Sequence, residues 1–191
     1  MDFGKLTDIS KVDFSLPKDG FLFLDKPNEN PLEVFVGPPI WANKAWLGKI
    51  YPHDAKDADF LYHYAQQFNT IELNVTHYQT PTDETIKRWK SQVGKLFTFC
   101  PKFPQSISHE RQLIGTADAT NHFVGQISKL EENLGTAFLQ LPPYLGFNRL
   151  QILKDYLKTL PKDLDIAVEF RHESWFEKNK CRCQLKCILY F

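Results

Sequence analysis

IAVEFRH, at residues 166–172, is a short apolar run that ends in charged side chains. Four earlier runs share this design: VFVG at 34–37, TIELN at 70–74, FTFCPK at 97–102 and AFLQLPP at 137–143. Helical patterns lie between the runs. Strands that alternate with helices predict an α/β fold with a parallel sheet and crossover helices. In such sheets and barrels, the functional site lies at the carboxyl ends of the strands.

Four amphipathic patterns separate the five predicted strands. The spacing of apolar residues predicts helices over about 56–68, 82–93, 120–134 and 150–160. Pro81 and Thr82 form the expected cap of the second helix, and Gly94 its stop. Residues 37–52 form a long aromatic loop after the first strand, which makes this loop a candidate wall of the site.

Length and composition indicate one globular domain. The chain has 191 residues, of which 42% are hydrophobic and 24% charged, enough for a sizeable core. The formal net charge is zero, so no nucleic-acid partner is expected. Residues 1–10 have no apolar signal region, and no apolar run approaches the roughly 18 residues of a membrane span. We therefore expect a cytoplasmic protein without membrane contact, with an N-terminal arm (1–32), a main domain (33–176) and a Cys/Lys-rich tail (177–191).

Four cysteines are present, three of them close to the end of the chain. Cys100 lies in an apolar run and is expected to be a small core residue. Cys181, Cys183 and Cys187 follow a C-x-C-x3-C spacing that matches the usual zinc patterns poorly. We therefore predict no metal and no cofactor.

The two-residue period of a strand separates an apolar face from a polar one. Ile71 and Leu73 share one face, and Glu72 shares the other with Asn74. The apolar face should meet the helices, and in a barrel the second face is the interior. The same rule predicts a polar layer near the strand ends that contains Glu72, Asn74, Lys102, Gln140, Glu169 and Arg171.

Two interpretations of this charged layer are open. Glu72 and Glu169 can pair with Lys102 and Arg171 in a closed structural network. Alternatively, the same groups face a polar ligand, with the carboxylates as acid and base, and the two cations holding negative charge. Asn74 and Gln140 would then orient the substrate. Their position at strand carboxyl ends favours a site, and our first hypothesis is a hydrolase or lyase for a small polar or anionic metabolite.

Further candidate ligand contacts follow the strands. His109, Glu110 and Arg111 lie in the turn after Lys102, and His172 follows Arg171. His77 is expected in a surface or hydrogen-bonded role. The aromatic residues Trp41, Trp46, Tyr78 and Trp175 could form a rim around the charged floor, which would suit a binding protein without catalysis. A third, metal-assisted version would use Glu72, His109 and Glu169 as ligands.

Four blocks carry a resemblance to a known family. They read FNTIELNVTHYQTPTDETIKRW, FTFCPKFPQSISHER, LGTAFLQLPP and AVEFRHESWF. In this order they resemble the YecE-like family, a domain of unknown function (DUF no. 72), over residues 34–176. The resemblance implies a TIM-type (β/α) barrel. It implies no reaction, because the family is named for lacking one.

The chain departs from the family pattern at two places. Gly37-Pro38-Pro39-Ile40-Trp41 stands where the family commonly has Gly-Thr-Ser-Gly-Trp. Family members also continue past the block that ends at Phe176, whereas here a Lys- and Cys-rich stretch leads to Phe191. We therefore expect a barrel that is truncated after its fifth strand, and self-association through the open strand edges becomes possible.

Overall fold

The computed structural model describes residues 33–176 and 188–189. The predicted N-terminal arm and most of the predicted tail, including Cys181, Cys183 and Cys187, lie outside the described residues. The described strands and helices all belong to the compact unit that begins at Phe35.

Strands and helices alternate along this unit. The strands are β1 (Thr70–Leu73), β2 (Thr98–Pro101), β3 (Ala137–Gln140), β4 (Ile166–Glu169) and β5 (Ile188–Leu189). The α-helices are α1 (Phe60–Ala65), α2 (Asp83–Lys90), α3 (Ala117–Ile127) and α4 (Leu150–Thr159). The 3-10 turns are η1 (Lys44–Trp46), η2 (Asp57–Asp59), η3 (Asn74–His77), η5 (Ser128–Asn133), η6 (Phe147–Arg149) and η7 (Glu173–Trp175), and η4 (Ser106–Glu110) is a π-helical turn.

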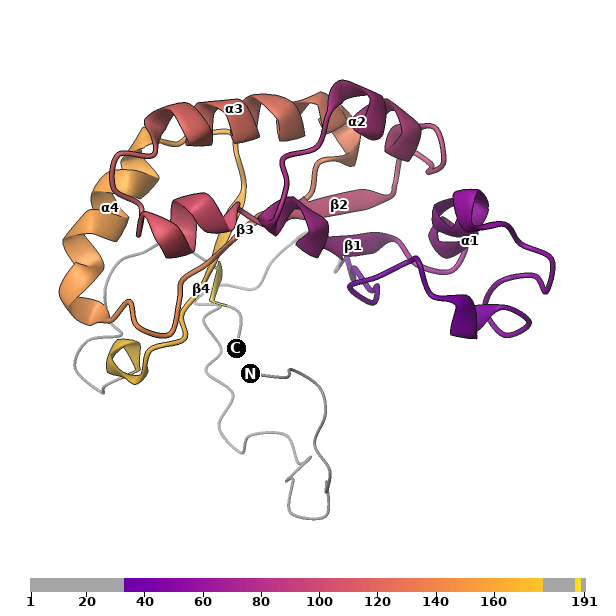
Figure 1. Cartoon of the computed structure of the whole chain (residues 1–191), viewed down its shortest axis with the longest axis horizontal. Coiled ribbons are helices and arrows are strands. Elements are labelled where there is room, and N and C mark those ends of the chain that lie inside the picture. Colours follow the sequence, from indigo (N-terminus) through magenta and orange to yellow (C-terminus); the bar gives the residue numbers. More distant parts are fainter. Residues whose placement is uncertain (1–32, 177–187, 190–191) are drawn as a thin grey trace, which may run out of the picture. The chain divides into compact units, whose positions relative to one another are not determined.

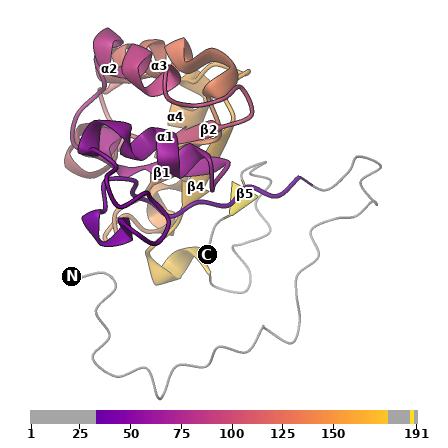
Figure 2. The same ribbon diagram turned by 90° about the vertical axis from the view of Figure 1, so that its right-hand side faces the viewer.

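All strand pairs of the described residues are parallel, as predicted. β1 pairs with β2, and β3 pairs with β4, which in turn pairs with β5. Isolated bridges from Phe99 to Leu134 and from Lys102 to Phe138 connect the two sheets. Helices α2, α3 and α4 form an arc on one side of strands β1 to β4 (Figure 1), and α2 and α3 stay above the strands in the perpendicular view (Figure 2). The α/β class is therefore confirmed.

Residues 34–37 form no strand, and this prediction is wrong. The amide of Val36 donates to the Oδ1 atom of Asn69 over 2.7 Å, so a side chain takes the place that a ladder carbonyl would fill. Gly37 packs tightly against the start of β1. A Cβ atom at this position would lie 1.8 Å from the carbonyl oxygen of Thr70 and 2.4 Å from the hydroxyl of Tyr64. The segment thus follows β1 at close range without pairing as a strand.

The predicted helices are found with shifted ends. Helix α2 has the expected cap, because the Oγ1 atom of Thr82 accepts from the amide of Thr85 over 3.3 Å. Helix α1 is shorter than predicted, since its first residues form the 3-10 turn η2. Helix α3 ends before the predicted boundary, and the chain continues as η5 with a kink at Glu131, where φ is 52°.

The apolar strand face forms the core. Ile71, Leu73, Phe99, Leu139 and Val168 are almost completely buried in one cluster with side chains of α2, α3 and α4. The alternation predicted from the two-residue period is thereby confirmed for β1 and β2, whereas in β3 and β4 the opposite-face residues Gln140 and Ala167 are buried as well. In the described ranges, no helix combines the length and apolarity that crossing a lipid bilayer requires.

Candidate functional site

Polar side chains gather where the strands end. We define the strand-end cluster as Glu72, Asn74, Lys102, Gln140, Glu169 and Arg171. Glu72 lies in β1 opposite Cys100 of β2, and Gln140 lies opposite Glu169 across β3 and β4. Lys102 directly follows β2 and bridges to Phe138. The parallel register therefore brings the polar residues that the strand period predicts to one edge of the strands.

Glu169 is held by two partners. Gln140 donates from Nε2 to Oε2 of Glu169 over 2.7 Å, and Arg171 forms an ion pair with Oε1 through its Nε atom. The Glu169 side chain is 20% exposed, so this contact lies at the border between core and solvent. Both carboxylate oxygens are engaged, which fixes Glu169 as an oriented anion.

Lys102 is a buried cation with few partners. The residue is 8% exposed, and its Nζ atom donates to Oδ1 of Asn74 over 3.3 Å. The same atom lies 5.1 Å from the ring centroid of Phe138. Burial lowers the pKa of Lys102, while the charges of Glu72 and Glu169 act in the opposite direction. Among the described residues, no carboxylate lies within ion-pair distance of this ammonium.

The carboxylate of Glu72 is less constrained by side-chain contacts than that of Glu169. No hydrogen bond joins its carboxylate to another side chain within the described part of the chain. Glu72 also lines two cavities. The larger, about 530 Å³, is the Trp41 cavity, and its wall includes Trp41, Asn74, Gln79, Thr82, Thr85, Arg88 and Trp89. The second, about 460 Å³, is the Cys100 cavity, and its wall includes Gly37, Thr70, Cys100, Thr136, Phe138 and Glu169.

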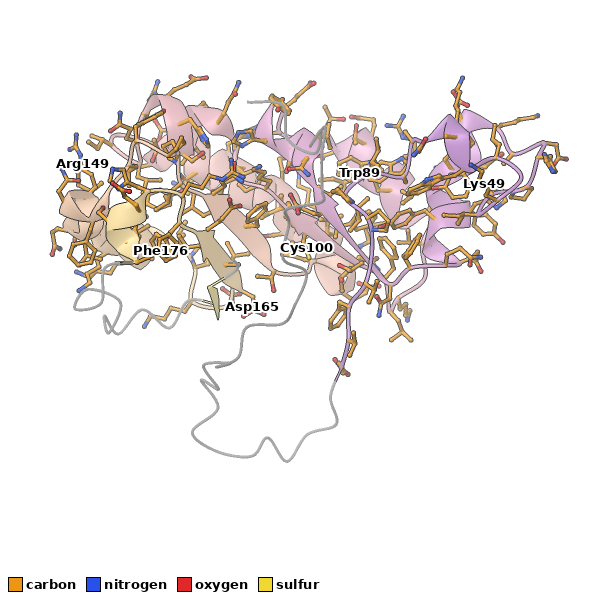
Figure 3. All side chains as sticks on the ribbon, turned by 90° about the horizontal axis from the view of Figure 1, so that it is seen from below. Lys49, Trp89, Cys100, Arg149, Asp165 and Phe176 are labelled. Carbon is orange, nitrogen blue, oxygen red and sulfur yellow. The ribbon has the colours of Figure 1, made fainter. Side chains whose placement is uncertain are left out.

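The Cys100 cavity occupies the second face of the strands. Cys100 is a free, partly buried thiol that lies 3.5 Å from the hydroxyl of Thr70, rather than a fully buried core residue. Burial raises the pKa of this thiol. Figure 3 views the strands from the side opposite α2 and α3 and labels Cys100. The cavity thus combines the Thr70 hydroxyl near the start of β1 with the Cys100 thiol, which lies at the level of Glu72, and with the carboxylate of Glu169 at the end of β4.

Two histidines lie next to the cluster. The rings of His77 and His109 meet edge to face, with centroids 5.0 Å apart. His77 is buried in its hydrogen-bonded role, and its Nδ1 atom donates to the carbonyl of Phe103 over 2.7 Å. His109 comes from η4, a π-helical turn of a kind that is frequent at functional sites. Sequence reasoning left His77 outside the candidate site.

The hydrogen bonds constrain the protonation of the two rings. Nδ1 of His77 donates to the carbonyl of Phe103, so the neutral His77 ring keeps a lone pair on Nε2. The Oγ atom of Ser108 lies 2.8 Å from Nδ1 of His109 and 3.2 Å from the carbonyl oxygen of Pro104, and either Ser108 or His109 can donate in their shared hydrogen bond. Burial lowers the pKa of His109 to about 4 and also lowers that of His77, and the cations Lys102 and Arg171 add to both shifts.

The remaining predicted contact residues are dispersed. Trp41 lines its cavity and packs edge to face on Trp89, with centroids 5.9 Å apart. Tyr78 is 75% exposed and contacts His77. Glu110 and Arg111 are both exposed, and Arg111 donates to the carbonyl of Gly115. Of the three residues predicted in this turn, His109 is thus the one that contacts His77 beside the strand-end cluster.

Three further candidates hold local structure together. The Nδ1 atom of His172 accepts from the amide of Ser174 over 3.1 Å and caps η7. Trp175 is 4% exposed and donates from Nε1 to the carbonyl of Leu145 over 2.7 Å. Trp46 packs on Tyr51 and Tyr64. Of the predicted aromatic rim, Tyr78 is therefore the most exposed member, and Trp41 is half-buried and lines a cavity.

The metal-assisted version receives no support. Across residues 33–176 and 188–189, no group of three or more His, Cys, Asp or Glu side chains is arranged to hold a metal ion. Glu72, His109 and Glu169 therefore do not form the ligand set that this version requires.

Parallel strands covered by helices on one side, with a polar cluster at their carboxyl ends, define an α/β protein of the kind that carries its site at the strand ends. The chain belongs to the family described as Protein of unknown function DUF72, whose sequence model matches residues 35–188. The resemblance seen in the sequence is thereby confirmed. The family supplies no established function.

Relatives from several bacteria support this assignment. The chain is 33% identical to the UPF0759 protein YecE of Escherichia coli over 147 residues, which cover 77% of the chain and 52% of that protein. A solved DUF72 family protein from Thermotoga maritima is 29% identical, with a TM-score of 0.64 over 76% of this chain and 58% of that one. Another, from Enterococcus faecalis, is 26% identical, with a TM-score of 0.57 over 63% and 46%. The chain spans about half the length of the curated relatives it matches.

Proposed function

We propose that the protein is an enzyme, a hydrolase or lyase, that acts on a small polar or anionic metabolite at the strand-end cluster. The observation that carries this proposal is Lys102. A buried ammonium loses most of its hydration, and here it has one hydrogen bond to Asn74. Its remaining donors suit a carboxylate or phosphate, which would supply the missing negative charge.

The other members of the cluster take complementary roles. Glu72 lines both cavities with a carboxylate that no described side chain occupies, so it is the stronger candidate for proton transfer. Glu169 is the second carboxylate, oriented by Gln140 and Arg171. Asn74 orients Lys102 and the substrate. The neutral His109 offers Nε2 as a further hydrogen-bonding group, a donor or an acceptor according to its tautomer.

We also propose that these strands belong to a TIM-type barrel. Their shared direction, the bridges between β2 and β3 and the alternation of core and polar faces support this arrangement. The second face would then be the barrel interior, with the Cys100 cavity as its accessible space.

A second candidate function is ligand binding without catalysis. The observation that favours it is Glu169, because both of its carboxylate oxygens are already bound to Gln140 and Arg171. A carboxylate that is fixed in this way suits a structural role better than a role in proton transfer.

The first experiment tests anion binding. Titration calorimetry with inorganic phosphate and with malonate would compare the wild type with Lys102→Met. Loss of a charge-assisted contact worth about 1.5–3 kcal/mol should weaken binding by about ten- to a hundredfold. Lys90→Met is the matched control, because Lys90 pairs with Glu131 away from the cluster. Equal binding by Lys102→Met and the wild type, or no binding by the wild type, would contradict the proposal.

A second measurement separates catalysis from binding. Small phosphate esters and carboxylates that bind are incubated with the protein and followed by NMR. An enzyme converts at least one of them, and Glu72→Gln should retain binding while it loses conversion. Ligands recovered unchanged would instead favour the binding protein.

A further inference from the structure

Lys102 differs from the other lysines whose contacts are known. Lys44, Lys90, Lys129 and Lys158 each form an ion pair with a carboxylate at the surface. Lys102 is buried without such a pair among the described residues, and its Nζ atom lies between the Asn74 amide and the Phe138 ring. An ion pair stabilises the charged form of lysine, and burial without one favours the neutral amine, although the ring face of Phe138 still favours the ammonium.

The hydrogen bond of Lys102 to Asn74 remains possible after it loses a proton, whereas its cation–π attraction to Phe138 is lost. Oδ1 of Asn74 accepts a hydrogen bond from an ammonium or from a neutral amine, so the Nζ atom stays oriented in both states. Phe138 provides an apolar neighbour that does not compete for the nitrogen lone pair. Burial lowers the pKa of Lys102, and each unit of such a shift raises the neutral fraction about tenfold near pH 7. Desolvated lysines of this kind act as nucleophiles toward carbonyl groups.

We propose that Lys102 is a nucleophile that forms an imine with a small aldehyde or ketone, which makes the strand-end cluster a lyase site for carbonyl substrates. This inference rests on the proposed function and names its substrate class. An anionic group on the same substrate would be held by the cluster, while the carbonyl carbon reaches Nζ.

The chemistry balances without any further reactant. The Nζ lone pair forms a bond to the carbonyl carbon, and the carbonyl π electrons move to the oxygen, which takes a proton as the nitrogen loses one. The resulting carbinolamine accepts a proton on its hydroxyl and releases water, and the nitrogen lone pair completes the C=N bond. No oxidant or reductant is consumed.

Glu72 is the group placed to carry these protons. It lies on the strand adjacent to β2, faces both cavities, and acts on Lys102 more strongly than Glu169 does. Glu72 would take the proton from the Lys102 ammonium and return it to the departing hydroxyl. Glu169 stays a fixed anion because Gln140 and Arg171 occupy it.

Reductive trapping tests the proposal. The full chain is incubated with pyruvate or glycolaldehyde and sodium cyanoborohydride, which reduces an imine to a stable amine, and the modified lysines are located by tandem mass spectrometry. If Lys102 were only structural, its burial would protect it, and exposed lysines would react first. We expect Lys102 to be modified faster than Lys90 or Lys158, because the cluster presents its amine to the substrate and burial lowers its pKa. Modification confined to the exposed lysines would overturn the proposal.

Two variants separate this proposal from the proposed function. Lys102→Arg lacks an amine nucleophile, so it should lose trapping at this position. Glu72→Gln should slow trapping of the intact Lys102. If the wild type binds phosphate through Lys102 but traps neither probe there, the imine is excluded and the proposed function stands. If phosphate also fails to bind, both are excluded.

Discussion

The amide of Gln140 and the carboxylate of Glu169 lie opposite each other on neighbouring parallel strands and share a hydrogen bond of 2.7 Å. Gln140 is 7% exposed, so a polar partner at this position has little access to water. The bond therefore connects the register of β3 and β4 to the orientation of a carboxylate at the candidate site.

Replacement of Gln140 should destabilise the fold. Gln140→Leu leaves the Oε2 atom of Glu169 without its donor, which should lower the free energy of unfolding by about 1–3 kcal/mol in urea titrations. Gln151→Leu is the matched control, because Gln151 bonds Asp155 on an exposed helix face and should change stability by less than about 0.5 kcal/mol. Equal effects of the two variants would contradict the structural role of the Gln140 contact.

Gly37 and Gly125 should respond in opposite directions to alanine. A methyl group at Gly37 would meet the Thr70 carbonyl at 1.8 Å, and relief requires a backbone shift at β1. Gly37→Ala should cost more than about 1 kcal/mol. Gly125 lies inside α3 with no atom within 4 Å of a new Cβ, so Gly125→Ala should stabilise by about 0.5–1 kcal/mol. Thermal unfolding of both variants measures the difference, and the same sign for both would refute it.

Acid should destabilise the protein through its histidine pair. The pKa of His109 is about 4 in the folded state and 6.5 as its ordinary value, so the unfolded chain binds a proton first as the pH falls. The stabilising contribution of the neutral His109 ring is therefore complete above pH 6.5 and is lost as the pH falls toward 4. The loss is at most about 1.4 kcal/mol per pH unit for each histidine, and smaller because the His109 ring is partly exposed.

The variant His109→Asn isolates this contribution. Asparagine keeps a donor toward Ser108 but does not titrate in this range, so the slope of unfolding free energy against pH should become flatter. Urea titrations at several pH values between 4 and 6.5 give this slope. An unchanged slope in the variant would assign the acid sensitivity to other groups.

The cap of α2 gives a local stability prediction. Thr82→Ala removes the acceptor of the Thr85 amide and should lower the free energy of unfolding by about 0.5–2 kcal/mol. Thr82→Ser retains a hydroxyl and should remain close to the wild type. A loss in the serine variant as large as in the alanine variant would instead point to the threonine methyl group.

Local patterns predicted the core and the parallel strands well. Alternation in TIELN predicted Ile71 and Leu73 in the core because successive side chains of a strand point to opposite faces, and these two share the apolar one. The same alternation predicted that Glu72 would occupy the opposite face, where it lines the Cys100 cavity. Thr82 was predicted as a cap from its position before an apolar period, and the structure confirms it.

The other predictions depended on contacts between residues that are distant in the sequence, which local patterns do not reveal. VFVG has strand composition, yet the side chain of Asn69 takes the amide of Val36. Trp175 follows a strand, as a rim residue would, but a carbonyl 30 residues away holds its indole. His77 joins the cluster through Phe103, 26 residues later. The available signal for His77 was its position one turn after Asn74, directly beyond β1.

The division of each four-residue strand between two faces has an evolutionary consequence. Each strand supplies the core with one set of residues and the candidate site with the other, so both depend on the same register. An insertion or deletion of one residue within β1 would send Glu72 toward the helices and an apolar side chain toward the cavity. Such strands can change by substitution but hardly by length, and we expect length variation between relatives to concentrate in the loops that follow them.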